Sequence, residues 1–206
     1  MMPTFRFDQA QLTSELDQLP LSLRVIFAAS CAERLLPAYI ASSGLTGNGD
    51  PELLTRILMR LWEDIAGERM TESELQSSVS ISMDLIPQDY HEPWFVEQAS
   101  AEDASAAVFY ALSCRQNGNS QEAMWSAQRA CSAVDHFVTN RENIDLKPPG
   151  AVNQALEHPL IQAELARQRR DLDELLRVVD EDVRQIAARF RDRAKAESKG
   201  FFGAPS

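Results

Sequence analysis

Apolar residues recur at helical spacing along almost the whole chain. Between Leu53 and Ile65 they fall three or four residues apart, which places them on one face of an amphipathic helix. Thr71 and Glu74 have the spacing of a capping box, and a second stripe of apolar residues follows them. The alternating pattern of strands is nearly absent. The sequence therefore predicts an all-α protein.

Helix start and stop signals divide this pattern into segments. Asp8 is a predicted N-cap of a short helix that stops at Pro20, and Asp50 followed by Pro51 opens another helix. The turn at 117–119 is short, so the long helices on either side of it are expected to pack as an antiparallel pair. We expect a single-domain bundle of about seven or eight helices over residues 1–197.

The last predicted element begins at His158 and Pro159. Its apolar stripe runs from Ile161 to Phe190 with an average step of about 3.6 residues, which is typical of a straight helix rather than a coiled-coil seam. We therefore expect a long C-terminal helix docked on the core. The tail, 198–206, is interpreted either as disordered or as docking its two phenylalanines.

The most unusual segment is 21–40, an almost wholly apolar helix that is interrupted by Glu33 and Arg34 and bent by Pro37. Proline lacks the amide that would bond the Glu33 carbonyl, so a bend is expected at the charged step. The segment is nearly long enough to cross a membrane, but Arg24 and the two later charges would be costly in lipid. It is interpreted as the central helix of the bundle, without a membrane partner.

Composition and charge narrow the range of partners. The chain of 206 residues is 44% hydrophobic and 25% charged, as in globular proteins, and its net charge is -11. An acidic surface repels phosphate groups, so we expect no nucleic-acid partner. Arginines of the final helix alternate with acidic residues, which favours ion pairs on the helix surface. A protein partner or self-association stays open.

The cysteines and the N-terminus bear on location. Cys31, Cys114 and Cys131 fall inside predicted helices without a CxxC pair, so they are interpreted as core residues in a reducing compartment. The first residues lack the basic and then apolar plan of a secretory signal. We expect a cytoplasmic protein.

The charged step of the central helix is the main candidate site. In one interpretation, Glu33, Arg34 and Tyr39 are polar contacts of a partly buried pocket at the bend, where burial would raise the pKa of Glu33. In the other, Glu33 or Arg34 forms a structural ion pair with a neighbouring helix, because buried charges need partners. The sequence leaves both open.

Two weaker candidates are Glu63 and His91. Glu63 precedes Asp64, and both are expected to be solvated; adjacent helical residues point about 100° apart, so the pair cannot bind one metal ion. His91 lies in a proline-flanked loop between Asp89 and Glu92 and is interpreted as a functional or simply exposed histidine.

Motifs that identify common enzymes are missing. The sequence has no Glu-x-x-His, no His-Glu-x-x-His, no phosphate-binding loop, no dinucleotide fingerprint and no Gly-x-Ser-x-Gly. We therefore expect no metal and no cofactor, and a protein without enzymatic activity is favoured over an enzyme.

The segment Cys31-x-Glu33-Arg34-x-x-Pro37-x-Tyr39 resembles a motif of the YjaG-like bacterial family of unknown function (domain of unknown function 416). The segments 56–63 and 158–164 are also similar to their counterparts in that family. The resemblance implies an all-helical, cytoplasmic, bacterial protein with no assigned activity, cofactor or catalytic residue.

Two functions follow as expectations. The first is a non-catalytic interaction or regulatory protein, acidic and cytoplasmic, which self-associates as a homodimer or binds another protein. The alternative is a small-molecule-binding protein or unrecognised enzyme with a pocket at the Glu33–Pro37 bend.

Overall fold

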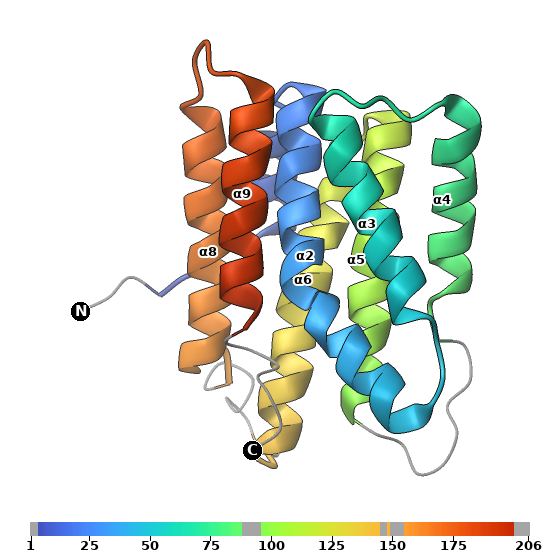
Figure 1. The fold of residues 1–206 in the computed structure, drawn as a ribbon. Coiled ribbons are helices and arrows are strands. Elements are labelled where there is room, and N and C mark those ends of the chain that lie inside the picture. Colours follow the sequence, from blue (N-terminus) through green and yellow to red (C-terminus); the bar gives the residue numbers. More distant parts are fainter. Residues whose placement is uncertain (1–3, 88–95, 145–147, 149–154, 200–206) are drawn as a thin grey trace.

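The computed structural model describes residues 4–87, 96–144, 148 and 155–199, with the side chains of 96 and 97 excepted. Within these residues the chain forms eight helices and no strand, which confirms the all-α bundle (Figure 1). The helices are α1 (Gln9–Leu16), α2 (Leu21–Thr46), α3 (Pro51–Ile65), α4 (Glu72–Asp84), α5 (Val96–Asn117), α6 (Ser120–Arg141), α8 (Pro159–Leu176) and α9 (Val183–Ser198).

Helix α2 is the centre of the bundle. It packs against α3, α5, α6, α8 and α9, and its residues from Val25 to Leu36 are all buried. In Figure 1 the pair α8 and α9 lies on one side of α2, and α3, α4 and α5 lie on the other. Because other helices surround α2, apolar residues on all of its faces are packed. This agrees with its almost wholly apolar sequence.

Pro37 lies within α2 without ending it. Figure 1 shows that the helix changes direction along its length, as expected where a proline removes a backbone hydrogen bond. The helix continues beyond the predicted end near Gly44, and Gly47 stops it with a φ of 69°, a left-handed conformation that glycine adopts without strain.

The predicted caps are confirmed. The Asp8 side chain accepts a hydrogen bond from the backbone of Gln11, and the Asp50 side chain caps α3 in front of Pro51. The capping box of α4 is complete, with both reciprocal bonds between residues 71 and 74. The alanine-rich α5 packs closely against α2 and α6, and the small side chains allow the helix backbones to approach.

The C-terminal segment docks on the core as predicted, but it consists of two helices rather than one long helix. Helix α8 ends at Leu176, and α9 begins after Asp182, whose side chain caps its first turn. Between them, Asp180 has a φ of 54°, and Val179 is 76% exposed although the periodic pattern placed it on the inner face. The spacing of apolar residues happens to continue across the turn, so it concealed the break.

Two predicted features lie outside the described residues. They are most of the loop that contains His91 and the tail from residue 200 onward.

Candidate functional site

Glu33 and Arg34, which form the charged step of α2, contact two different helices. Adjacent residues on a helix point about 100° apart, so Glu33 faces α3 while Arg34 faces α8. Both side chains are buried. The two residues therefore do not form one site.

Arg34 lies at the centre of a buried ion-pair network. Its side chain is 1% exposed and donates hydrogen bonds to Glu164 at 3.0 Å and to Asp171 at 2.9 Å, both on α8. It also donates to the sulfur of Cys31 one turn earlier, at 3.4 Å. Gln168 bonds the same Glu164 oxygen at 2.9 Å. The guanidinium thus connects the central helix to α8.

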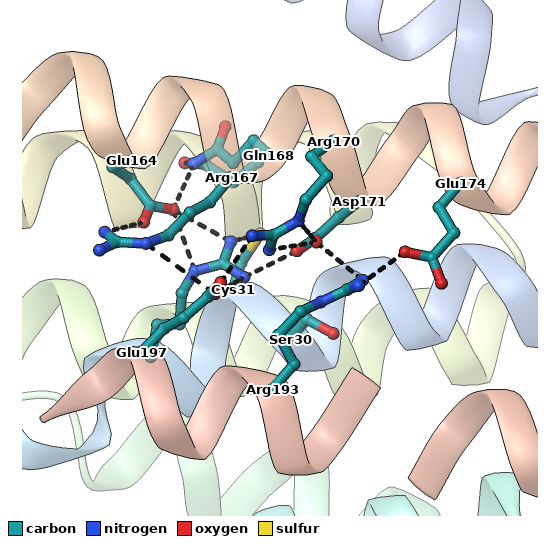
Figure 2. A network of polar contacts seen from close by, with 12 residues as sticks. Ser30, Cys31, Glu164, Arg167, Gln168, Arg170, Asp171, Glu174, Arg193 and Glu197 are labelled. Atoms are coloured by element: carbon teal, nitrogen blue, oxygen red, sulfur yellow. Dashed lines mark hydrogen bonds and ion pairs between the residues drawn. The ribbon is translucent and has the colours of Figure 1, made fainter. Parts of the chain in front are cut away.

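A second layer of charges surrounds this centre (Figure 2). Arg170 bridges Asp171 at 2.7 Å and Glu197 of α9 at 2.8 Å. Arg193 of α9 bridges Asp171 at 3.0 Å and Glu174 at 2.6 Å. With Arg34, Arg167 and Glu164 included, the network holds as many arginines as carboxylates, so its formal charge is balanced.

Burial and the neighbouring carboxylates shift the pKa values of the groups at the centre of the network. Burial by itself would lower the pKa of Arg34, but the carboxylates of Glu164 and Asp171 raise it well above its usual value. Burial raises the pKa of the Cys31 thiol and of the Cys131 thiol far above the ordinary range. Neither cysteine is therefore a thiolate near neutral pH, and a nucleophilic role for Cys31 has no support.

Glu33 is bonded to a residue of α3. The indole nitrogen of Trp62 in α3 donates a hydrogen bond of 2.8 Å to its carboxylate, and the residue is 6% exposed. Burial raises the pKa of Glu33; the Trp62 bond and the more distant Lys195 and Arg191 of α9 act in the opposite direction. The carboxylate is therefore buried between α2 and α3.

Tyr39 lies beyond the bend and borders a cavity of about 290 Å³. Its hydroxyl donates to the carbonyl of Leu85 at 3.1 Å. The cavity lies between the last turns of α2, the end of α4 and the start of α5, and Glu33 and Arg34 are not among the described residues that line it. The three main candidates are thus not brought together, and the cavity is displaced from the predicted bend.

Glu63, a weaker candidate, and its neighbour Asp64 lie in different surroundings. Glu63 is partly exposed and lies 4.0 Å from Arg60, whereas Asp64, predicted to be solvated, is fully buried. Asp64 accepts hydrogen bonds from Arg115 at 2.6 Å and from the backbone of Met70 at 2.8 Å, which compensate for its burial. His91 lies outside the described residues.

Several polar residues of the core were missed by sequence reasoning. Glu164, Gln168 and Asp171 recur four and three residues apart, so they form a polar stripe beside the apolar face of α8, a signal that the sequence did contain. A separate buried carboxylate, Asp103, accepts from Arg129 at 3.0 Å and pairs with His136 at 3.2 Å. No sequence motif marked that pair.

Within the part of the chain that the structure describes, no three residues of the types His, Cys, Asp and Glu are grouped so that they could hold a metal ion. Helix α2 has the length and mean hydropathy of a membrane span, but 83% of that apolar window is buried inside the bundle. A core helix of a soluble bundle has the same composition, so this match is weak evidence for a membrane.

Comparison with known proteins adds a family but no activity. The sequence model of DUF416, described as a protein of unknown function, matches residues 11–200. The crystal structure of a DUF416 family protein from Shewanella baltica OS155 is similar, with a TM-score of 0.73 and 19% identity, over 88% of this chain and 93% of that one. No curated protein matches. The family resemblance is confirmed, and the narrower YjaG-like name stays a prediction.

Proposed function

The chain belongs to the DUF416 family of unknown function, and on that premise we propose that it is a non-catalytic interaction or regulatory protein. One observation carries the proposal. Glu33 and Arg34 were the strongest candidates for a chemical role. Inside the core, their polar atoms are bonded to Trp62, Glu164 and Asp171. A side chain whose polar atoms are buried and bonded inside the core does not meet a substrate.

The surface charge supports a protein partner. The net charge of -11 repels nucleic acid and anionic membranes but not a basic protein surface. Arginines of α8 and α9 that could contact phosphate are paired with acids, for example Arg169 with Asp173 and Arg189 with Glu174. A cytoplasmic location and self-association are parts of the same proposal.

Two measurements test it together. The full chain is used to capture partners from native extract at physiological salt, with an unrelated acidic helical protein as control bait, and its own mass in solution is measured by sedimentation velocity. We expect either a reproducibly enriched protein or a dimer. A monomer that enriches nothing over the control bait would refute the proposal.

A second candidate function is binding of a small molecule, with an unrecognised enzyme as its catalytic form. The cavity beside Tyr39 favours it, because about 290 Å³ is close to the lower limit of typical ligand sites. This candidate site lies at the end of α2 and not at the Glu33–Pro37 bend, where the sequence led us to expect it. A screen of small fragments by protein-observed NMR tests it: shifts should cluster on residues around Tyr39, and shifts scattered over the surface would exclude this site.

A further inference from the structure

Residues 4–8, in front of α1, form a segment without helical structure, hereafter the N-terminal arm. Its second and fourth residues, Phe5 and Phe7, are half-buried, whereas the three others are exposed. This alternation is typical of an extended chain, in which side chains two residues apart point to the same side. In Figure 1 the N-terminal end lies on the α8 side of the bundle. The arm therefore presents two phenylalanines to one surface.

The surface beneath the arm is apolar and is shared by α6 and α8. Four buried residues of these helices form a cluster separate from the main core, hereafter the α6–α8 patch: Val134, Val138, Ile161 and Leu165. Phe5 and Phe7 both pack against this patch, and Phe7 also packs against the main core. Aromatic side chains bury a large apolar area when they dock. The patch thus accepts an extended segment that carries aromatic side chains at alternate positions.

A single side chain of α8 bonds the backbone of the arm. The Gln162 side-chain oxygen accepts a hydrogen bond from the N–H of Phe5 at 2.8 Å, and its amide nitrogen donates to the carbonyl of Phe5 at 3.0 Å. The same nitrogen donates to the carbonyl of Leu156 at 2.7 Å, which fixes the orientation of the amide. Every peptide unit carries the two groups that Gln162 bonds, so this contact recognises an extended backbone and not a particular side chain.

We propose that the α6–α8 patch is a peptide-binding surface, and that its partner is an extended segment of another protein with aromatic side chains two residues apart. The N-terminal arm occupies the patch in the free protein and competes with that partner. Two hydrogen bonds, both from Gln162, join residues 4–7 to the rest of the described chain, so the arm can leave without breaking a bond within a helix. This inference rests on the first proposed function and specifies the surface and the chemistry of the partner.

The arm of a second copy is a poorer occupant than another protein. It would have to displace an identical segment that is tethered to the patch at an effective concentration on the order of 1 mM, and the exchange would gain no new contact. A different protein adds contacts outside the patch to the two aromatic positions, and these contacts offset the advantage of the tethered arm.

A fluorescent peptide with the sequence of residues 4–10 tests the patch by fluorescence anisotropy with the full chain. The double variant Phe5→Ala/Phe7→Ala removes both rings of the arm and keeps every residue of the patch. We expect saturable binding of the peptide to this variant below about 1 mM, and binding to the wild type at least about tenfold weaker, because its own arm competes. A peptide with alanine at both phenylalanine positions should not bind.

The backbone contact has a test of its own. In the double variant, the further change Gln162→Leu removes both hydrogen bonds to the peptide and should weaken its binding about tenfold. The matched control is Gln185→Leu, which replaces an exposed glutamine of α9 outside the patch and should leave the affinity unchanged. Far-UV circular dichroism verifies that each variant keeps its helices.

Each result has a defined meaning. No saturable binding to the double variant at up to about 1 mM, or equal binding of the alanine peptide, would overturn the inference. The proposed function would survive that failure, because partner capture and the mass in solution do not depend on the peptide. Equal affinity of the peptide for the wild type and the double variant would refute competition by the arm. A dimer of the wild type that Phe5→Ala/Phe7→Ala abolishes would assign the patch to a second copy instead of another protein.

Discussion

Removal of the buried arginine of α2 is the sharpest test of the core. In Arg34→Met, the long side chain is replaced by an apolar one that fills a similar path between α2 and α8. The hydrogen bonds to Glu164 and Asp171 disappear, and two buried carboxylates lose the cation at their centre. The fold must then hold desolvated negative charge without its main partner.

The expected loss of stability in Arg34→Met depends on the contacts that Glu164 and Asp171 keep. Removing one member of a buried ion pair costs about 3–5 kcal/mol, because the other charge stays buried. Asp171 keeps its bonds to Arg170 and Arg193, whereas Glu164 keeps only Gln168 at 2.9 Å and Arg167 at 3.7 Å. We therefore expect the lower limit, about 3 kcal/mol, which lowers Tm by roughly 6–12 °C for a chain of this length.

Chemical and thermal unfolding followed by circular dichroism measure this loss. The control is Arg189→Met on α9, where the arginine is 41% exposed and pairs with Glu174 and Glu181, so it should lose less than about 1 kcal/mol. Adding Glu164→Gln to Arg34→Met should recover part of the stability, since the stranded charge is removed. Equal losses in Arg34→Met and Arg189→Met, or no recovery, would refute the reasoning.

Three other substitutions have defined outcomes. Burial raises the pKa of Glu33, so the protonated group contributes stability below its unfolded pKa, and this contribution is lost as pH rises through the folded pKa. The free energy of unfolding of Glu33→Gln, relative to that of the wild type, should therefore increase as pH rises above about 4.5 in unfolding titrations. Gly49 has a φ of 86°, and a Cβ there would lie 2.7 Å from the Tyr39 hydroxyl oxygen, so Gly49→Ala should lose about 1–3 kcal/mol in denaturant unfolding. Asp182→Ala removes the cap of α9 and should lower the free energy of unfolding by about 1 kcal/mol.

Controls for these variants come from the same chain. Gly44→Ala changes a helical glycine that has nothing within 4 Å, so it should stabilise α2 by about 0.5–1 kcal/mol where Gly49→Ala destabilises. Equal effects at the two glycines would contradict the account of Gly49. A pH-independent difference between Glu33→Gln and the wild type would show that the carboxylate is not desolvated. An unchanged stability of Asp182→Ala would mean that the side-chain cap is not needed to start α9.

Local signals in the sequence were sufficient for most of the helices. Asp8, Asp50 and Thr71 were identified as caps because each satisfies backbone amides only a few residues away. The α8–α9 turn was missed for the converse reason, since a stripe at helical spacing cannot distinguish a continuous helix from two whose phases agree. The acidic residues at 180–182 were the available signal.

The sequence by itself determined an all-helical bundle around one apolar helix and located a charged step in that helix. Only the tertiary structure decided what the step does: Arg34 meets carboxylates about 130 residues away, Glu33 meets Trp62, and Tyr39 borders a separate cavity. The physical reason is the distance along the sequence over which each kind of interaction acts. Caps and helical periodicity arise within a few residues, whereas the partner of a buried charge depends on which helices pack together, and no local pattern specifies that.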